Sequence, residues 1–115
     1  TYSRAADLSF YVGRLLTISG TASMDPDGRT AYKDDIDGQI DLTVRVIHAI
    51  LNGRGMDWRN TIRAIVYYRR PDDAARFEAY CRRAAIPALP AIPVCATVCR
   101  DDLLFEIELD AWANR

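Results

Sequence analysis

The chain has 115 residues, of which 50% are hydrophobic and 27% charged, a composition typical of one globular domain rather than of a disordered segment. Its 15 basic and 16 acidic residues leave a formal net charge of −1, which gives no reason to expect nucleic acid or an anionic membrane surface as a partner. No apolar run approaches the about 20 residues of a membrane span, and no signal-peptide pattern opens the sequence, so we expect a single domain over residues 1–115.

Two β-strands are predicted at the start of the chain, over residues 8–12 and 15–23. The dipeptide Gly13-Arg14 separates them and is a plausible tight turn. Both strands have mixed faces, since neither face is fully polar. The segment 24–28 is rich in turn-forming residues and predicts a loop.

The clearest helix is predicted over residues 35–52. Asp35 favours its start and Gly53 its end. The only histidine, His48, lies on the polar side of this helix, where a surface role is the simpler interpretation than a catalytic one. The apolar positions recur at helical spacing: Ile36, Ile40, Val44, Ile47 and Leu51.

A strand and a second helix follow. Asp57 is a candidate cap for a short turn, and residues 61–70 are rich in β-branched and aromatic side chains, which favours a strand. Pro71 and the two aspartates after it predict a helix that reaches about Ala84. The predicted inward positions of this helix are Ala74, Phe77, Cys81 and either Ala84 or Ala85. Residues 86–93 hold three prolines and predict a stiff extended connector.

The last third of the chain predicts a β-hairpin, because two alternating runs flank the polar dipeptide Asp101-Asp102. This pairing sets Val98 opposite Phe105 and Thr97 opposite Glu106. The expected apolar face holds Val94, Ala96, Val98, Phe105, Ile107 and Leu109. The expected polar face holds Cys95, Thr97, Cys99, Glu106 and Glu108. Such a face is either a chemical site or an ordinary half-solvated strand pair.

The three cysteines do not predict a disulfide or a metal site. Cys95 and Cys99, on one strand, would be separated by roughly 13 Å at about 3.3 Å per residue, which is too far for a disulfide. Cys81 falls on the second helix. We therefore expect reduced thiols and a cytoplasmic protein. No CxxC pair or His/Cys cluster indicates zinc, and no metal or cofactor is expected.

The predicted order is β-β-α-β-α-β-β, an α+β fold with a single sheet. Two helices can cover only one face of such a sheet, while the other face still carries apolar residues. A patch of this kind is rarely left exposed on a monomer. We therefore expect other copies of the chain to bury it, with cyclic symmetry.

This order of elements and several local motifs resemble the Rid family, the YjgF-like proteins that are often labelled L-PSP endoribonucleases. The matching motifs are Ile18-Ser19-Gly20, the loop 25–28, Gln39, Gly55, the run 66–68, Pro90-Ala91 and Glu106-Ile107-Glu108. The resemblance covers residues 2–112 and implies a chorismate-mutase-like homotrimer with three clefts between subunits.

The deaminating branch of that family places an arginine just after the Pro-Ala pair to bind a substrate carboxylate. Ala91 and Ile92 occupy that place here, and neither side chain binds an anion. The family's asparagine on the second helix is also missing, with Glu78 as the nearest match. Both departures count against the usual enamine and imine deamination.

Segments 2–5, 19–23 and 98–108 are similar to the carboxy-terminal domain of chorismatases, which cleave the enolpyruvyl side chain of chorismate and carry two Rid-like domains in one chain. The similarity implies that Glu106 corresponds to their proton-donating glutamate and Cys99 to a cysteine beside the substrate ring. This chain has one such domain, so self-association would have to supply the second wall of the cleft.

Glu106 is the candidate general acid. A carboxylic acid protonates carbon near neutral pH only if burial raises its pKa, and the charge of Glu108 on the same face would raise it further. A solvated acidic face that continues to Asp110 is the alternative. Cys99 is either nucleophilic or a packing residue.

The remaining candidates would bind the substrate. Ser19 offers a hydroxyl, and Gly20 permits close approach to the backbone. Thr97 would lie beside Glu106, and Tyr2 would close the cleft. Arg100, at the predicted turn, is the preferred anchor for a carboxylate, with the arginines at 63 and 69 also available.

Three functions therefore stay open. The first is a hydrolase or lyase that acts on a chorismate-like enol ether with a carboxylate. The second is an enamine or imine deaminase in which another arginine replaces the missing one. The third is a non-catalytic ligand-binding or regulatory trimer. In each case we expect a homotrimer and a small-molecule ligand, with no nucleic acid and no membrane as partner.

Overall fold

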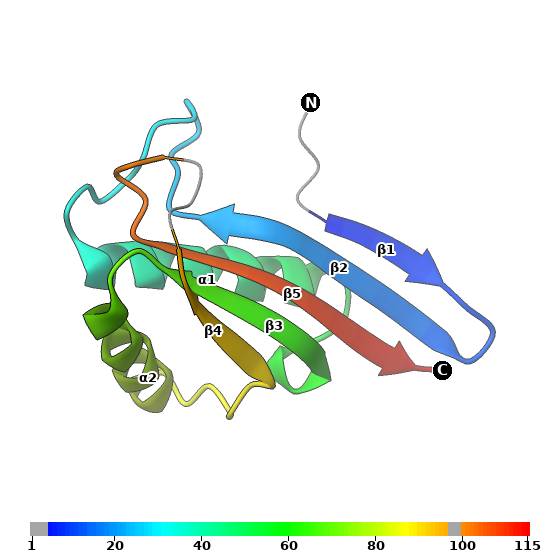
Figure 1. Cartoon of the computed structure of the whole chain (residues 1–115). Coiled ribbons are helices and arrows are strands. Elements are labelled where there is room, and N and C mark those ends of the chain that lie inside the picture. The colour runs from blue at the N-terminus through cyan, green and yellow to red at the C-terminus, as the bar shows by residue number, and fades with distance from the viewer. Residues whose placement is uncertain (1–4, 97–99) are drawn as a thin grey trace.

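The structure is a computed structural model that describes residues 5–96 and 100–115. It is an α+β fold with one five-stranded sheet in the order β1-β2-β5-β3-β4 (Figure 1). The strands are β1 (Ala5–Ser9), β2 (Gly13–Ala22), β3 (Thr61–Tyr68), β4 (Ala91–Cys95) and β5 (Phe105–Asn114). The helices are α1 (Ile36–Gly53) and α2 (Ala74–Arg83), with short 3₁₀ turns at Trp58–Asn60 and Pro71–Asp73. The predicted order of elements is confirmed.

The first hairpin turns two residues earlier than predicted. Phe10 and Gly13 exchange backbone hydrogen bonds of 2.7 and 3.4 Å, so Tyr11 and Val12 form the turn and Gly13 begins β2. A Cβ atom at Gly13 would lie 2.3 Å from the Trp112 ring. The glycine is therefore explained by close packing under Trp112 and not by a turn at Gly13-Arg14.

The predicted C-terminal hairpin is wrong. β4 pairs in parallel with β3, in the register Tyr67↔Val94, and β5 pairs antiparallel with both β2 and β3. β3 therefore lies between the two strands that were expected to be partners. A turn does occur at Asp101-Asp102, where the Leu103 N–H donates to the Arg100 carbonyl at 3.2 Å. It leads into a buried segment that bonds α1 rather than into a paired strand, because the Leu104 N–H donates to Gln39 Oε1 at 2.9 Å.

This pairing also inverts the predicted faces of β4. Val94 shares the face of Tyr67, and Cys95 shares the face of Tyr68. The apolar positions of β5 are as predicted, since Phe105, Ile107 and Leu109 are fully buried. Pro93 lies inside β4 rather than in the connector, and an edge strand tolerates it.

Helix α1 begins and ends as the sequence predicts. Asp35 caps it through the Gly38 N–H at 3.0 Å, and Ile40, Val44, Ile47 and Leu51 are buried. His48 is exposed, 2.9 Å from the Asn52 side chain, which confirms its surface role.

Fewer residues at the end of helix α2 face the core than the sequence analysis expected. Phe77 is buried and Cys81 half-buried, but Ala84 and Ala85 are exposed. Ala85 has a φ of 55°, a left-handed conformation that ends the helix at Arg83. The chain then turns toward β4 before either alanine can face the sheet.

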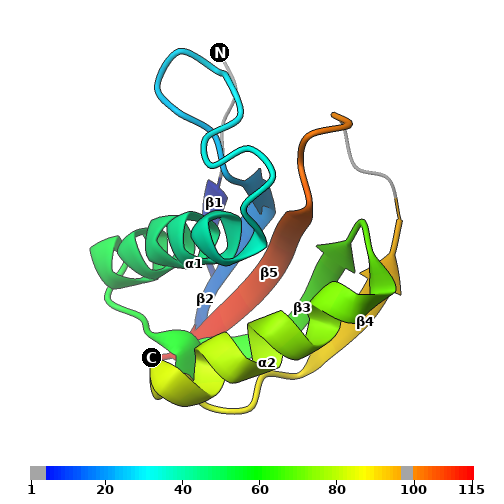
Figure 2. The same ribbon diagram turned by 90° about the vertical axis from the view of Figure 1, so that its left-hand side faces the viewer.

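Both helices cover the same face of the sheet (Figure 2). Phe105 lies at the centre of this core, with its ring 5.7 Å from that of Tyr68 and 5.2 Å from that of Phe77. We call the opposite side the open face, because no helix of the described chain covers it. No helix among the described residues has the length and apolar character needed to span a membrane.

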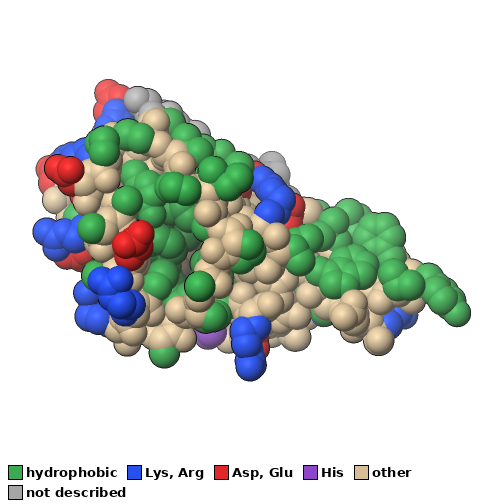
Figure 3. Space-filling model, turned by 60° about the horizontal axis from the view of Figure 1, so that its bottom comes forward, with side chains coloured by type: hydrophobic (Ala, Val, Ile, Leu, Met, Phe, Trp, Pro, Cys, Tyr) green, Lys and Arg blue, Asp and Glu red, His purple; other side chains and the backbone are tan. Residues whose placement is uncertain are grey.

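An exposed apolar cluster lies at the tip of the first hairpin. Leu8, Phe10, Tyr11 and Val12 are between 47% and 96% exposed, and Figure 3 shows the patch that hydrophobic side chains form at this end of the molecule. The Phe10 ring lies 6.0 Å from that of Trp112. Apolar residues thus remain uncovered on the single chain, as the sequence analysis expected.

Candidate functional site

The candidate acid, Glu106, lies near the start of β5 on the open face. It pairs with Tyr67 of β3 on one side and with Ala22 of β2 on the other. Its neighbours Phe105 and Ile107 are fully buried on the helix side, and strand alternation therefore turns Glu106 away from the helices. The side chain is half-buried although no helix covers it.

Gly20 lies directly against the Glu106 carboxylate. A Cβ atom at Gly20 would be 2.8 Å from Glu106 Oε2, so a side chain there would force the glutamate to shift. The register of β2 and β5 shifts between Ile18 and Thr21, and this irregularity contains Ser19 and Gly20. Ser19 is exposed, and its carbonyl accepts a hydrogen bond from the Thr21 hydroxyl at 2.9 Å. The structure thus brings together Ser19-Gly20 and Glu106, which are far apart in the sequence.

The environment of Glu106 is suited to a general acid. Burial, and after it the negative charge of Glu108, raises the pKa of the Glu106 carboxyl above its ordinary value. The sequence analysis named both of these causes. A raised pKa lets a carboxyl group retain its proton at a pH where an exposed one has lost it.

Glu108 is held in a different way. Arg63 Nη2 donates to Glu108 Oε2 at 3.1 Å, and the Tyr67 hydroxyl donates to Oε1 at 2.9 Å. Arg63 also donates to Asp110 at 2.8 Å. Both oxygens of Glu108 therefore accept hydrogen bonds. The two glutamates thus have different surroundings, since Glu106 lies against Gly20 while Glu108 is held by Arg63 and Tyr67.

Sequence reasoning missed Tyr67 as a member of this cluster. Its hydroxyl pKa is raised, first by the hydrogen bond to Glu108 and then by burial. The motif Val66-Tyr67-Tyr68 had been noted in the sequence. The predicted hairpin, however, put Thr97 opposite Glu106, whereas in the structure Tyr67 is the residue opposite Glu106.

The other predicted site residues make no hydrogen bond or ion pair with Glu106 or lie outside the described residues. Arg100 is exposed at the turn before β5. Ile92, in the place of the family's arginine, is 63% exposed on the open face and pairs with Ile65. Tyr2, Thr97 and Cys99 lie outside the described residues.

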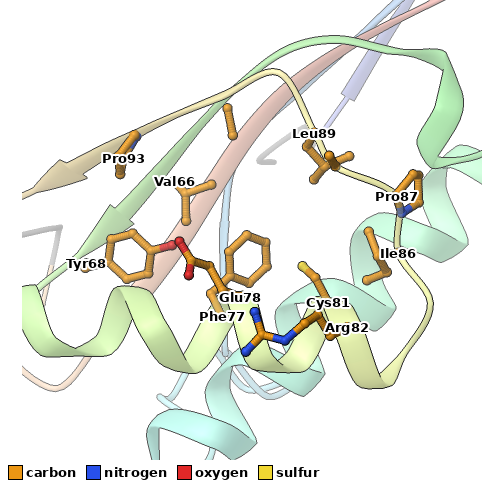
Figure 4. A pocket seen from close by; sticks show the side chains of 12 residues that line it. Val66, Tyr68, Phe77, Glu78, Cys81, Arg82, Ile86, Pro87, Leu89 and Pro93 are labelled. Atoms are coloured by element: carbon orange, nitrogen blue, oxygen red, sulfur yellow. The ribbon is translucent and has the colours of Figure 1, made fainter.

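A cavity of about 430 Å³ lies on the other face of the sheet, between α2, β4 and the connector before β4 (Figure 4). Phe77, Leu89 and Pro93 form part of its largely apolar wall. Burial raises the pKa of the Cys81 thiol in it, which makes this thiol a poor nucleophile. None of the predicted site residues that the structure describes lines this cavity.

The side chains around Glu106 do not resemble a metal site. Among the residues that the structure describes, no group of three or more His, Cys, Asp or Glu side chains is arranged to hold an ion. The arrangement instead provides a carboxylic acid beside a glycine and a hydrogen-bonded carboxylate.

Comparison with known proteins places this geometry in context. The model of the family described as Endoribonuclease L-PSP matches residues 1–113. A solved structure of the YjgF gene product from E. coli has 20% identity and a TM-score of 0.76, over 96% of this chain and 87% of that chain. RidA from Psychrobacter sp. PAMC 21119 has 19% identity and a TM-score of 0.79, over 98% and 89% of the two chains.

Two longer proteins are also similar. A protein of Streptomyces hygroscopicus named 3-hydroxybenzoate synthase is 34% identical over an alignment 115 positions long, which covers 92% of this chain and 33% of that protein. A chorismatase crystal structure has 24% identity and a TM-score of 0.80, over 96% of this chain and 36% of the other. The chain thus spans about a third of the length of each.

Proposed function

Because the chain belongs to the endoribonuclease L-PSP family, whose members include the Rid proteins, we propose that it forms a homotrimer and cleaves a chorismate-like enol ether in clefts between its subunits. The observation that carries this proposal is the half-buried Glu106 carboxyl, whose pKa is raised and which lies against Gly20 on the open face. Glu106 is the general acid of the proposed reaction.

The chemistry requires one well-placed proton. The terminal CH₂ carbon of an enolpyruvyl ether is electron-rich, and protonation there by Glu106 produces a cation stabilised by the ether oxygen. Water adds to the cation to give a hemiketal, which breaks down to pyruvate and the ring alcohol. A general acid of this kind contributes about 10²–10⁴-fold to the rate.

The names of two relatives support this substrate class. One is called a 3-hydroxybenzoate synthase and the other a chorismatase, and the motifs that carry the similarity include Glu106 and the Ser19-Gly20 pair. Hydrolysis of chorismate takes up one water and gives pyruvate and a dihydroxycyclohexadiene carboxylate, whereas elimination of pyruvate, with no net uptake of water, gives a hydroxybenzoate. Analysis of the ring product therefore distinguishes simple hydrolysis from an elimination that forms the aromatic acid.

Self-association would complete the site. Tyr11 and Val12 at the hairpin tip and Ile92 on the open face leave apolar surface uncovered, and closed cyclic assemblies bury such surface. Sedimentation velocity is expected to give a species of about three times the 13.0 kDa chain mass. A monomer at all concentrations would remove the clefts from the proposal.

The activity test is direct. The protein is incubated with chorismate, pyruvate is measured with lactate dehydrogenase, and the ring product is identified by mass spectrometry. Pyruvate release is expected from the wild type and a loss of about 10²-fold or more from Glu106→Gln. Glu78→Gln is the matched control, since Glu78 lines the cavity on the other face, and it should retain the wild-type rate.

The same preparations decide between the alternatives. Release of no pyruvate by the wild type would overturn the proposed reaction. Faster loss of freshly generated 2-aminoacrylate would favour a deaminase, although aliphatic Ile92 stands where that branch has its arginine. Binding of chorismate without turnover of either compound would favour the non-catalytic trimer.

A further inference from the structure

Arg69 directly follows β3, near the end of the sheet that carries Glu106. Tyr67 pairs with Glu106 and Tyr68 with Phe105, and the Arg69 N–H donates to the Leu104 carbonyl at 3.1 Å. β3 itself ends at Tyr68, and this one backbone hydrogen bond keeps Arg69 beside the segment that leads into β5. The alternation of side chains along β3, continued one residue past its end, would put Arg69 on the side of Tyr67 and Glu106.

The guanidinium of Arg69 is only partly satisfied. Its side chain is 22% exposed, and Nη2 donates to Asp101 Oδ1 at 3.1 Å. The other terminal nitrogen, Nη1, is buried and has no hydrogen-bond partner among the described residues. A buried donor without an acceptor is destabilising, all the more when the group is charged.

Asp101, the side-chain partner of Arg69 among the described residues, is easily displaced. The Asp101 side chain is fully exposed, and an ion pair with an exposed partner is weak and screened by salt. Asp101 also lies on the turn before β5, where the backbone is not paired in the sheet. An incoming carboxylate would therefore compete with a weak interaction.

The other candidate arginines are less suitable. Arg63 already donates to both Glu108 and Asp110, so its fork is occupied by two carboxylates. Arg100 is exposed, and water would compete for any anion there. Arg69 alone among these three combines partial burial with an unused donor.

We infer that Arg69, rather than Arg100, binds the carboxylate of the substrate, and that this carboxylate replaces Asp101. The inference rests on the proposed function for the identity of the substrate. A planar carboxylate accepts from Nη1 and Nη2 together, which satisfies the donor that now lacks an acceptor. A site built on Arg69 is thereby specific for small anionic molecules.

The separation fits the proposed chemistry. Diagonal neighbours on paired strands lie about 7–8 Å apart between Cα atoms, and the flexible arginine side chain adjusts this span. In an enolpyruvyl group the carboxylate is attached to the carbon next to the CH₂ that takes the proton. A single small group can therefore reach Glu106 with its CH₂ and Arg69 with its carboxylate.

A binding experiment tests this inference without any turnover. Titration of the purified protein with 2-methoxypropanoate, a saturated analogue that keeps the carboxylate of the enolpyruvyl ether, and with 2-methoxypropanamide as its neutral counterpart, should show preference for the acid. Arg69→Met should weaken binding of the acid by about 10- to 100-fold and leave the amide unchanged. Arg69→Lys should recover part of the loss, because lysine keeps the charge but not the fork. Arg100→Met is the control and should bind like the wild type.

Asp101→Asn provides a test in the opposite direction. It removes the competing carboxylate without emptying the site, so affinity for the acid should rise by about two- to fivefold. In turnover assays Arg69→Met should raise KM more than it lowers kcat. Thermal unfolding of each variant shows whether it is folded.

The outcomes separate this inference from the proposed function. Equal binding of acid and amide by the wild type, or an effect of Arg100→Met as large as that of Arg69→Met, would overturn it. Selective, Arg69-dependent binding without pyruvate release would support the anchor while overturning the proposed reaction.

Discussion

The two faces of the sheet differ most clearly along β5, where each step of one residue moves from one face to the other. Phe105, Ile107 and Leu109 are fully buried beneath the helices. Glu106, Glu108 and Asp110 lie between them in sequence and project from the open face. One strand thus supplies both the centre of the core and the whole acidic row.

The comparison shows how the fold separates stability from chemistry. On the helix side, aromatic rings pack around Phe105 at 5.2 and 5.7 Å, and this burial contributes much of the folding free energy. On the open face, the acidic side chains make hydrogen bonds and ion pairs that contribute little to stability. The charge of Glu108 instead helps to raise the pKa of Glu106. Adjacent residues should therefore respond to substitution in opposite ways.

The largest expected effect is on the helix side. Phe105→Ala removes a fully buried ring and should lower the free energy of unfolding by about 3–5 kcal/mol. Glu106→Gln, one residue further, should change it by less than about 1 kcal/mol. Urea denaturation followed by circular dichroism measures both. Similar losses of unfolding free energy for the two variants would show that stability does not depend mainly on the helix side of the sheet.

The next effect should appear in activity rather than stability. Gly20→Ala places a methyl group 2.8 Å from Glu106 Oε2, and the flexible glutamate must move away. Displacement of a reacting group by about 1 Å costs up to about 10²-fold in rate, so we expect a loss of about 10- to 100-fold in pyruvate release with little change in unfolding.

Gly53→Ala is the matched control for that variant. A Cβ atom at Gly53 would meet nothing within 4 Å, so this substitution should leave the rate unchanged. Full activity of Gly20→Ala would mean that the present position of the Glu106 carboxylate is not the reactive one.

A third effect concerns pH. If protonated Glu106 is the acid, activity falls as pH rises through its raised pKa. Glu108→Gln removes the negative charge that contributes to this shift, so the falling limb should move to lower pH. Asp110→Asn also removes a partner of Arg63 but does not contribute to the Glu106 shift, and its limb should stay in place. Pyruvate release measured across pH distinguishes the two variants.

Stability should depend on the same proton. The folded state holds a proton on Glu106 more tightly than the unfolded chain does, because its pKa is raised on folding. This contribution is present below the ordinary glutamate pKa and is lost as pH rises through the raised one. The loss should be absent in Glu106→Gln, and urea midpoints at several pH values would show it.

The smallest effect should come from ion pairs. Arg63→Gln on the open face breaks contacts with two carboxylates and should lower the free energy of unfolding only slightly, because water and salt screen exposed ion pairs. Arg45→Gln on the outer side of α1 breaks one pair with Asp41, four residues away, and should cost a few tenths of a kcal/mol, about 0.3–0.5. Urea denaturation measures both losses in the free energy of unfolding. A larger loss for Arg45→Gln than for Arg63→Gln would contradict this order.

The sequence alone determined the elements and the two sides of β5. Local rules suffice there, because a period of 3.6 predicts α1, a period of two separates Phe105 from Glu106, and Asp35 and Asp57 are recognisable caps. The resemblance to the Rid family was likewise visible in short motifs spread over the chain.

Strand pairing was decided only by the tertiary structure. The runs before and after Asp101-Asp102 alternate as a hairpin does, yet β3 lies between β4 and β5. The reason is that β4 gains a parallel partner in β3, while Leu103 and Leu104 are buried beside Gln39 of α1. Such long-range pairings depend on which surfaces close the core, and no local pattern records them. The partners of Glu106, namely Gly20 and Tyr67, followed from that choice.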